Sequence, residues 1–219
     1  MSFLTTIIEW EGPIIDVRPR YWAAHQAAVK AVGFQGPPEN EFWRLHRTGA
    51  PDGMMVPYGK PHHVAEYTRL RNEQINSTEL MALDQLQPRV IENLKVLKSM
   101  GVCHMVSLCQ NRDGINATLN RLDVWIYFEQ KRALPQDSDR RVAAIRELMG
   151  GGRTLAVAGT VPFAFAANEA GCRVVGISSG PTFPKFLRQV GVDVFYEDLD
   201  QLTDALARHA PELQRIGIV

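Results

Sequence analysis

Two carboxylates near the start of the chain, Glu9 and Glu11, are the residues best placed to do chemistry. They follow an apolar run that begins at Leu4, and Gly12 comes next. A buried strand that stops at two acids delivers them to its carboxyl end, and side-chain alternation puts positions i and i+2 on the same side. Such acids could act as a nucleophile, a proton carrier or a metal ligand. From these residues alone, an exposed strand end with two solvated acids is the alternative.

The composition limits the class of protein and of partner. With 219 residues, of which 45% are hydrophobic and 22% charged, the chain can bury the core of one medium domain or of a domain with an insert. The 24 Lys and Arg residues balance the 24 Asp and Glu residues, so no overall field favours nucleic acid or an anionic membrane. No apolar run reaches the roughly 18 to 20 residues of a membrane span. We therefore expect no nucleic-acid partner and no membrane partner.

The cysteines are odd in number and far apart: Cys103, Cys109 and Cys172. This usage argues against a disulfide framework and predicts a reducing, cytoplasmic location. Cys103 and His104 are neighbours on one expected strand, so their side chains point to opposite faces, which argues against a zinc site. The glycine run 150–152 lacks the Lys-Ser or Lys-Thr of a nucleotide-binding phosphate loop.

Short apolar runs alternate with longer amphipathic stretches, which predicts parallel strands joined by crossover helices. The fold class is therefore α/β, with a Rossmann-like sheet that carries helices on both faces. Expected strands cover 4–9, 103–108, 125–128, 154–158, 173–178 and 193–196, and expected helices cover 87–100, 112–122, 138–148, 162–170, 182–189 and 199–208.

Residues 18–86 break this alternation. The helical patterns 21–32, 39–47 and 61–76 follow one another with no strand between them. This predicts a helical cap domain at 18–86, inserted into a core domain made of 1–17 and 87–219. If the insert covers the site, its basic side chains would face the mouth of that site; these are Arg47, Lys60, His62 and His63.

The order of these elements resembles the haloacid dehalogenase superfamily, of the phosphoglycolate phosphatase and β-phosphoglucomutase type with a helical cap. Residues 9–16 occupy the place of the family's first motif, where Glu9 and Glu11 replace two aspartates. Ser107 stands at the family's phosphate-binding hydroxyl, and Lys131 or Arg132 at its phosphate-binding cation. Gly159 and Phe163 occupy the two acidic positions that help to hold Mg²⁺ in the family.

The resemblance implies a specific chemistry, and the substitutions change it. In the family the first aspartate attacks phosphorus, the second transfers a proton, and Mg²⁺ bridges nucleophile and phosphate. The extra methylene of Glu9 moves its oxygens by roughly one ångström, enough to slow a positioned attack. Gly159 and Phe163 remove two negative charges from the cation site, and Phe163 with Phe165 would line it with aromatic rings.

These substitutions predict a phosphoric-monoester hydrolase fold that is impaired as a Mg²⁺-dependent phosphatase and has no metal. We expect such a protein to act by binding a small phosphorylated or anionic metabolite, a protein partner or a second copy of itself. Aspartate at positions 9, 159 and 163 is expected to raise Mg²⁺ affinity.

Two alternatives remain open. In the first, the protein is an atypical hydrolase that acts on a small phosphorylated metabolite through Glu9 and Glu11, and only then would Mg²⁺ be a cofactor. In the second, it is a flavodoxin-like or receiver-type module that signals through protein contacts. The insert after the first strand argues against the second, because those folds pass directly from strand to helix and back.

Overall fold

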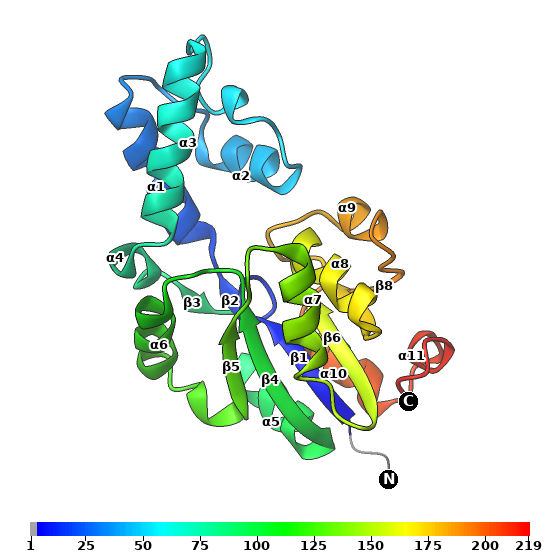
Figure 1. The fold of residues 1–219 in the computed structure, drawn as a ribbon. Coiled ribbons are helices and arrows are strands. Elements are labelled where there is room, and N and C mark those ends of the chain that lie inside the picture. Colours follow the sequence, from blue (N-terminus) through cyan, green and yellow to red (C-terminus); the bar gives the residue numbers. More distant parts are fainter. Residues whose placement is uncertain (1–3) are drawn as a thin grey trace.

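A parallel sheet forms the base of the molecule. The computed structural model describes residues 4–219. Within that range six strands lie in the order β5-β4-β1-β6-β7-β8, and every neighbouring pair is parallel (Figure 1). Their bounds are β1 (Leu4–Glu9), β4 (Gly101–Ser107), β5 (Gln130–Ala133), β6 (Arg153–Ala158), β7 (Arg173–Ile177) and β8 (Val194–Tyr196). The central β1 therefore ends between the carboxyl ends of β4 and β6, where ligands of open α/β sheets bind.

Helices cover both faces of the sheet because successive residues of β1 point to opposite sides. Ile8 packs in one buried cluster with Leu94 and Leu202, and Ile7 packs in another with Ile145 and Phe163. The helices are α5 (Val90–Met100), α6 (Arg112–Arg121), α7 (Ser138–Arg146), α8 (Val161–Ala170), α9 (Pro184–Arg188), α10 (Leu199–Ala207) and α11 (Pro211–Arg215). This confirms the predicted α/β class with helices on both faces.

A helical module, defined as residues 18–81, stands off the carboxyl edge of the sheet (Figure 1). It contains α1 (Arg18–Ala31), α2 (Glu39–Arg47), the 3-10 turn η1 (Asp52–Met54), α3 (Pro61–Ile75) and α4 (Thr78–Met81). Phe42, Leu45 and Tyr67 belong to a buried cluster of its own. The chain enters and leaves the module through an antiparallel pair, β2 (Ile15–Asp16) and β3 (Gln85–Leu86). Separate folding of 18–86 from 1–17 and 87–219 stays a prediction.

The predicted strand at 125–128 is wrong. Those residues form mainly the 3-10 turn η2 (Trp125–Tyr127), in which Trp125 and Ile126 are about half exposed, and the strand follows as β5. The aromatic run has high β-propensity, which is why a strand was predicted there. The strand that forms is β5, an edge strand whose polar side chains tolerate solvent. The other predicted strands agree with the structure to within two residues at each end.

None of the helices within 4–219 combines the length and the apolar character that crossing a membrane requires.

Candidate active site

Glu9 ends β1 and turns its carboxyl group toward the loop between β6 and α8. The amides of Gly159 and Thr160 donate to its Oε2 at 2.7 and 2.8 Å, and the Thr160 hydroxyl lies 2.5 Å from its Oε1. Glu9 is fully buried. The acid at the family's nucleophile position thus binds protein groups at the amino end of α8.

The start of α8 explains this arrangement. Thr160 is the N-cap residue of the helix, and its hydroxyl accepts from the amide of Phe163 at 3.4 Å. The first amides of a helix have no partner within it, and the helix dipole favours negative charge at this end. The extra methylene of glutamate lets the carboxyl group of Glu9 reach across from β1 to these donors.

Glycines let the loop after β1 approach the loop after β6. A Cβ on Gly159 would lie 2.5 Å from the Glu11 carbonyl oxygen and 2.9 Å from Cδ of Pro13. Gly12 has a φ of +102°, and a Cβ there would lie 2.8 Å from Cδ of Pro181. A side chain at either position would require the loops to move apart.

The pKa of Glu9 is raised to about 8, mainly because the residue is buried and in part because Glu11 lies nearby. The hydrogen bonds from Thr160 and Gly159 oppose this shift because they favour the ionised form. The net shift favours the protonated form of Glu9 near neutral pH. A protonated acid is a poor nucleophile.

Glu11 turns toward β4 and the helical module. The Ser107 hydroxyl donates to Oε1 of Glu11 at 2.8 Å, and Nη2 of Arg20 lies 3.9 Å from the same oxygen. The other oxygen, Oε2, is buried and has no hydrogen-bond partner in the structure. Burial raises the pKa of Glu11, whereas Arg20 and Ser107 lower it.

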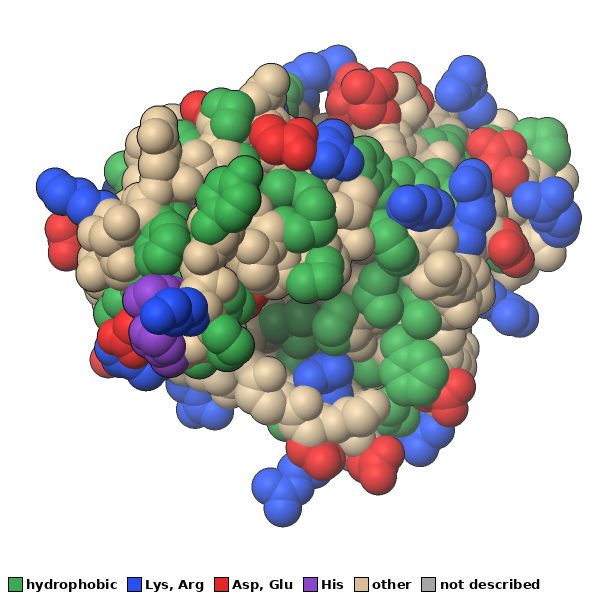
Figure 2. Space-filling model, turned by 90° about the horizontal axis from the view of Figure 1, so that it is seen from above, with side chains coloured by type: hydrophobic (Ala, Val, Ile, Leu, Met, Phe, Trp, Pro, Cys, Tyr) green, Lys and Arg blue, Asp and Glu red, His purple; other side chains and the backbone are tan. Residues whose placement is uncertain are grey.

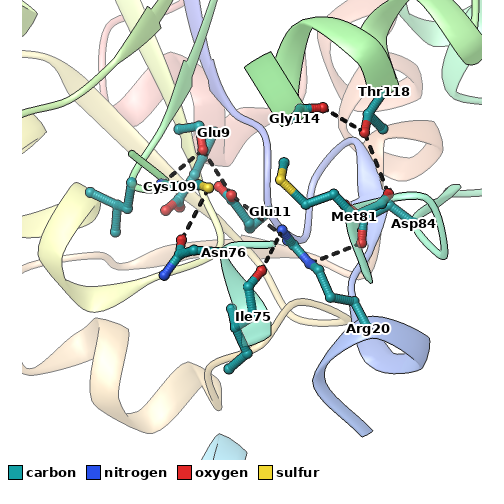
Figure 3. Close-up of polar contacts among 12 residues, drawn as sticks. Glu9, Glu11, Arg20, Ile75, Asn76, Met81, Asp84, Cys109, Gly114 and Thr118 are labelled. Carbon is teal, nitrogen blue, oxygen red and sulfur yellow. Dashed lines mark hydrogen bonds and ion pairs between the residues drawn. The ribbon is translucent and has the colours of Figure 1, made fainter. Parts of the chain in front are cut away.

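Arg20, from α1, connects the helical module to the sheet (Figure 3). Its Nε lies 3.1 Å from Oδ1 of Asp84, in the segment that leads back to the sheet, and its Nη1 donates to the Ile75 carbonyl at 3.4 Å. Arg20 is 1% exposed and Asp84 is fully buried. Burial raises the pKa of Asp84 to about 7, although Arg20 lowers it. Arg20 thus faces acids on both chain segments that join the module to the core.

A cleft of about 280 Å³ opens beside Glu11, between the helical module and the carboxyl ends of the strands. Arg71 lines it from α3, and its guanidinium pairs with Asp52. The lining residues are Glu11, Arg20, Tyr21, His46, Arg71, Asn72, Ile75, Asn76, Leu108, Cys109, Gln110, Gln136 and Thr160. Two guanidinium groups and several carboxamides thus surround one carboxyl group.

Ser107, expected at the phosphate-binding position, lies beside Glu11, and its hydroxyl is already hydrogen-bonded within the protein. It donates to Glu11 and accepts from the amide of Cys109 at 3.0 Å. Phe163 is fully buried in the core between α8 and the sheet, whereas Phe165 is 42% exposed. The expected aromatic lining by both rings is therefore wrong.

Lys131 and Arg132 do not join this site. Both lie within β5, paired with Met105 and Val106 of β4, rather than beyond the strand's carboxyl end. Lys131 donates to the Trp125 and Phe128 carbonyls, and Arg132 pairs with Glu147 at 2.6 Å. They line a different cleft, with Arg112, Ile115, Asn116 and Ala133. The prediction failed because it placed the preceding strand five residues too early.

Of the basic residues expected at the mouth of the site, Arg47 lines a second cleft that adjoins the one beside Glu11. Its guanidinium donates to the Ser178 carbonyl and stacks on the Phe183 ring at 4.1 Å. The Arg47 carbonyl accepts from the Phe183 amide at 3.2 Å. Lys60, His62 and His63 lie instead around the start of α3, where the Lys60 amide donates to Nδ1 of His63. They line neither the cleft beside Glu11 nor the adjoining cleft that Arg47 lines.

The sequence interpretation missed Arg20, Asp84 and Thr160. Thr160 carried a usable signal, because a Thr followed two residues later by Pro162 is typical of a helix N-cap. Arg20 and Asp84 are far apart in the sequence, and each resembles an ordinary solvent-exposed charge. Their pairing depends on the tertiary structure.

No protein-family model and no curated protein matches this sequence. Solved structures do match. A haloacid dehalogenase-like hydrolase from Streptococcus pneumoniae superposes with a TM-score of 0.74 at 13% identity, over 94% of this chain and 97% of that one. A predicted phosphoglycolate phosphatase from Haemophilus somnus gives 0.70 at 19% identity, over 95% and 99% of the two chains. This chain has the haloacid dehalogenase-like fold. The fold expected from the sequence resemblance is thereby confirmed.

The haloacid dehalogenase-like fold implies a Mg²⁺ ion beside the end of β1, so the residues present must be tested against that ion. Mg²⁺ needs several oxygen ligands in near-octahedral order. Both oxygens of Glu9 already contact donors on Gly159 and Thr160, and Gly159 and Phe163 supply no side-chain oxygen. Across residues 4–219 no group of three or more His, Cys, Asp and Glu side chains could hold a metal ion. The residues present do not fit Mg²⁺ at this position.

Proposed function

We propose that this protein binds a small anionic metabolite between its helical module, acting as a cap, and the sheet, and that it does not catalyse Mg²⁺-dependent phosphoryl transfer. The observation that carries the proposal is the set of contacts between Glu9 and the donors of Gly159 and Thr160. An in-line attack needs a free, ionised carboxylate beside a cation that neutralises the phosphate. Glu9 offers neither.

The cleft beside Glu11 supplies the binding groups. Guanidinium groups of Arg20 and Arg71 face it, and each already has a carboxylate partner, Asp84 and Asp52. With Glu11 ionised, three carboxylates would accompany the two guanidinium groups. With Glu11 protonated, two carboxylates balance the two guanidinium groups. Burial raises the pKa of Glu11, so falling pH brings this group to the balanced, protonated state sooner than it would an exposed glutamate. We expect an anion to bind more tightly as pH falls.

Two measurements test this function. The first is hydrolysis of p-nitrophenyl phosphate with and without Mg²⁺, for the wild type and for Glu9→Gln. The expected result is no Mg²⁺-dependent turnover above the rate of Glu9→Gln. Mg²⁺-dependent turnover that disappears in Glu9→Gln would refute the proposal. The second is calorimetric titration with methylphosphonate, whose carbon-phosphorus bond is not a hydrolysable ester.

In the titration we expect wild-type binding that weakens at least tenfold in Arg71→Gln, because this change removes a cleft cation and keeps a hydrogen-bonding side chain. The matched control is Arg69→Gln on the same helix, whose guanidinium is exposed and pairs with Glu66 and Glu73. Equal weakening in both variants, or no binding by the wild type, would contradict anion binding in this cleft.

A second candidate function is an atypical hydrolase in which Glu11 transfers the proton. Among residues 4–219 its Oε2 has no hydrogen-bond partner, its pKa is raised, and the residue lines the cleft. These are the properties of a positioned general acid. This candidate predicts slow turnover that does not depend on Mg²⁺ and is lost in Glu11→Gln. We also propose that the protein is cytoplasmic and that a protein or a second copy of itself is an alternative partner.

A further inference from the structure

The cleft beside Glu11 continues into a second cleft of about 500 Å³, between α2, the start of α8 and the loop before α9. The two clefts share four lining residues, Tyr21, His46, Leu108 and Thr160. We call them the inner and the outer cleft. Volumes of this order are those of sites for small organic molecules. One ligand can therefore occupy both parts.

The outer cleft is more apolar than the inner one. Its lining includes Val161, Pro162, Pro181 and Phe186, and none of its described lining residues is an Asp or Glu. Arg47 is its charged residue, and that guanidinium already contacts Ser178 and Phe183. The face seen from above has a hollow whose visible wall is largely hydrophobic (Figure 2). Such a surface favours an apolar group over a second charged group.

The passage between the two parts is aromatic and uncharged. The rings of Tyr21 and His46 meet edge to face with centroids 4.9 Å apart. Burial lowers the pKa of His46 to about 4 and raises that of Tyr21, so both side chains are neutral at pH 7. A flat apolar group can lie against them without desolvating a charge.

The inner cleft has the opposite character. Arg20 and Arg71 face it, and the buried Oε2 of Glu11 has no hydrogen-bond partner within the described part of the chain. An unpaired buried oxygen is costly, so a ligand group that hydrogen-bonds to it gains affinity. With Glu11 protonated, that partner is an acceptor, such as an oxygen of an acid anion.

We propose that the ligand is an amphipathic oxyacid. Its anionic head, a phosphate, phosphonate or carboxylate, binds in the inner cleft, and its apolar aryl or short alkyl body lies against Phe186 and Val161 in the outer cleft. This inference rests on the proposed function and deepens it, because it adds the apolar body to the anion. The possible head groups share negatively charged oxygens. The experiment uses one pair of probes with a phosphonate head and one pair with a carboxylate head to tell them apart.

The experiment compares matched probes by calorimetry on the full chain. Phenylphosphonate is titrated against methylphosphonate, and phenylacetate against acetate, because each pair shares a head and differs in one ring. We expect the phenyl member to bind at least tenfold more tightly in one pair or both, which corresponds to about 1.4 kcal/mol. A preference only in the first pair identifies a phosphoryl-type head, and only in the second a carboxylate.

Variants locate the ring. Phe186→Ser should reduce the preference for phenyl to less than threefold, through weaker binding of the phenyl probes. Phe186→Leu, which stays apolar, should keep most of the preference for phenyl. The matched control is Phe165→Ser, since Phe165 is 42% exposed and lines neither cleft. Should Phe186→Ser fail to fold, the near-isosteric Val161→Thr carries the test, with an expected two- to threefold loss of preference.

The outcomes separate the two proposals. If methylphosphonate and phenylphosphonate, and acetate and phenylacetate, bind equally well, the amphipathic ligand is refuted and anion binding stands. A phenyl preference that survives Phe186→Ser, or that Phe165→Ser abolishes, also refutes it. If none of the four probes binds, anion binding in the inner cleft fails, and this inference fails with it.

Discussion

The carboxyl group of Glu9 and the amide of Gly159 lie 2.7 Å apart, across the gap between the ends of β1 and β6. In the family that this fold resembles, two aspartates would stand at these positions and a cation would separate them. Here the glutamate is long enough to contact the opposite backbone directly, and the glycine leaves the room for it. The two substitutions therefore compensate each other structurally, and a change at either position acts on the other.

The length of the Glu9 side chain should control stability. Glu9→Asp draws the carboxyl group back by one methylene, so its bonds to Gly159 and Thr160 weaken, and we expect a loss of about 2 kcal/mol in the free energy of unfolding. Glu9→Ala leaves those donors buried without an acceptor and should cost about 3 to 5 kcal/mol. Glu9→Gln keeps both an acceptor and a donor and should cost less than about 1 kcal/mol at pH 6. Urea unfolding measures all three, and equal stability of Glu9→Asp and wild type would contradict this structural role.

Stability should fall as pH rises through neutrality. The pKa of Glu9 is raised from 4.5 to about 8 on folding, so between these values the folded protein holds a proton that the unfolded chain has released. The stabilisation that this bound proton provides is complete below pH 4.5 and is lost by pH 8. The free energy of unfolding falls by up to about 1.4 kcal/mol per pH unit between these values. Glu9→Gln cannot ionise and lacks this loss. We expect the wild type to lose stability relative to Glu9→Gln between pH 5 and pH 8; parallel unfolding curves across that range would show that the proton is not held.

Restoring the family's acids should not restore the metal site. The sequence resemblance suggested that aspartates at positions 9, 159 and 163 would raise Mg²⁺ affinity. The structure changes that expectation, because a Cβ at position 159 would lie 2.5 Å from the Glu11 carbonyl oxygen. Phe163→Asp would also place a carboxylate in a fully buried core position.

We therefore expect Gly159→Asp alone to lower the free energy of unfolding by about 3 kcal/mol or more, within the range for overpacked and strained sites. Gly159→Ala serves as the control, since it adds the Cβ without the charge and should account for most of the loss. Thermal unfolding with and without 10 mM Mg²⁺ provides the measurement. Stabilisation by Mg²⁺ in the triple aspartate variant would contradict this prediction.

The sequence was informative wherever local pattern and burial agree. The apolar run of β1 and the glycine that separates α5 from β4 place Glu9, Glu11 and Ser107 at one edge of the sheet, and the structure brings them there. The pattern failed at β5, because an edge strand can be polar, and the apolar residues before it form a turn. Lys131 and Arg132 were assigned to the site through the family resemblance, but both lie within β5 rather than beyond its carboxyl end.

The partners of the two acids could not be predicted from local pattern. An arginine such as Arg20 in the first turn of a helix is usually exposed, and only the meeting of α1 with the segment at Asp84 buries it. The direction of Glu9 depends on where the loop after β6 lies, since the same side chain could have faced solvent. Sequence pattern thus placed the acids, but the contacts that decide their chemistry depend on tertiary packing.

Arg20 should contribute stability mainly above neutral pH. Arg20→Met keeps an unbranched apolar stem but removes the guanidinium charge that faces Glu11 and Asp84. Breaking a buried pair leaves an uncompensated charge, which typically costs about 3 to 5 kcal/mol. We expect a loss of this size at pH 8. At pH 5 the loss should be smaller, because both acids have raised pKa values, that of Asp84 about 7, and take up protons instead.

The matched control is Arg89→Met, which breaks the exposed 3.0 Å pair with Asp200 and should cost less than about 1 kcal/mol at either pH. Urea unfolding at pH 5 and pH 8 checks both variants, and a loss in Arg20→Met that is independent of pH would show that Arg20 contributes through packing rather than charge.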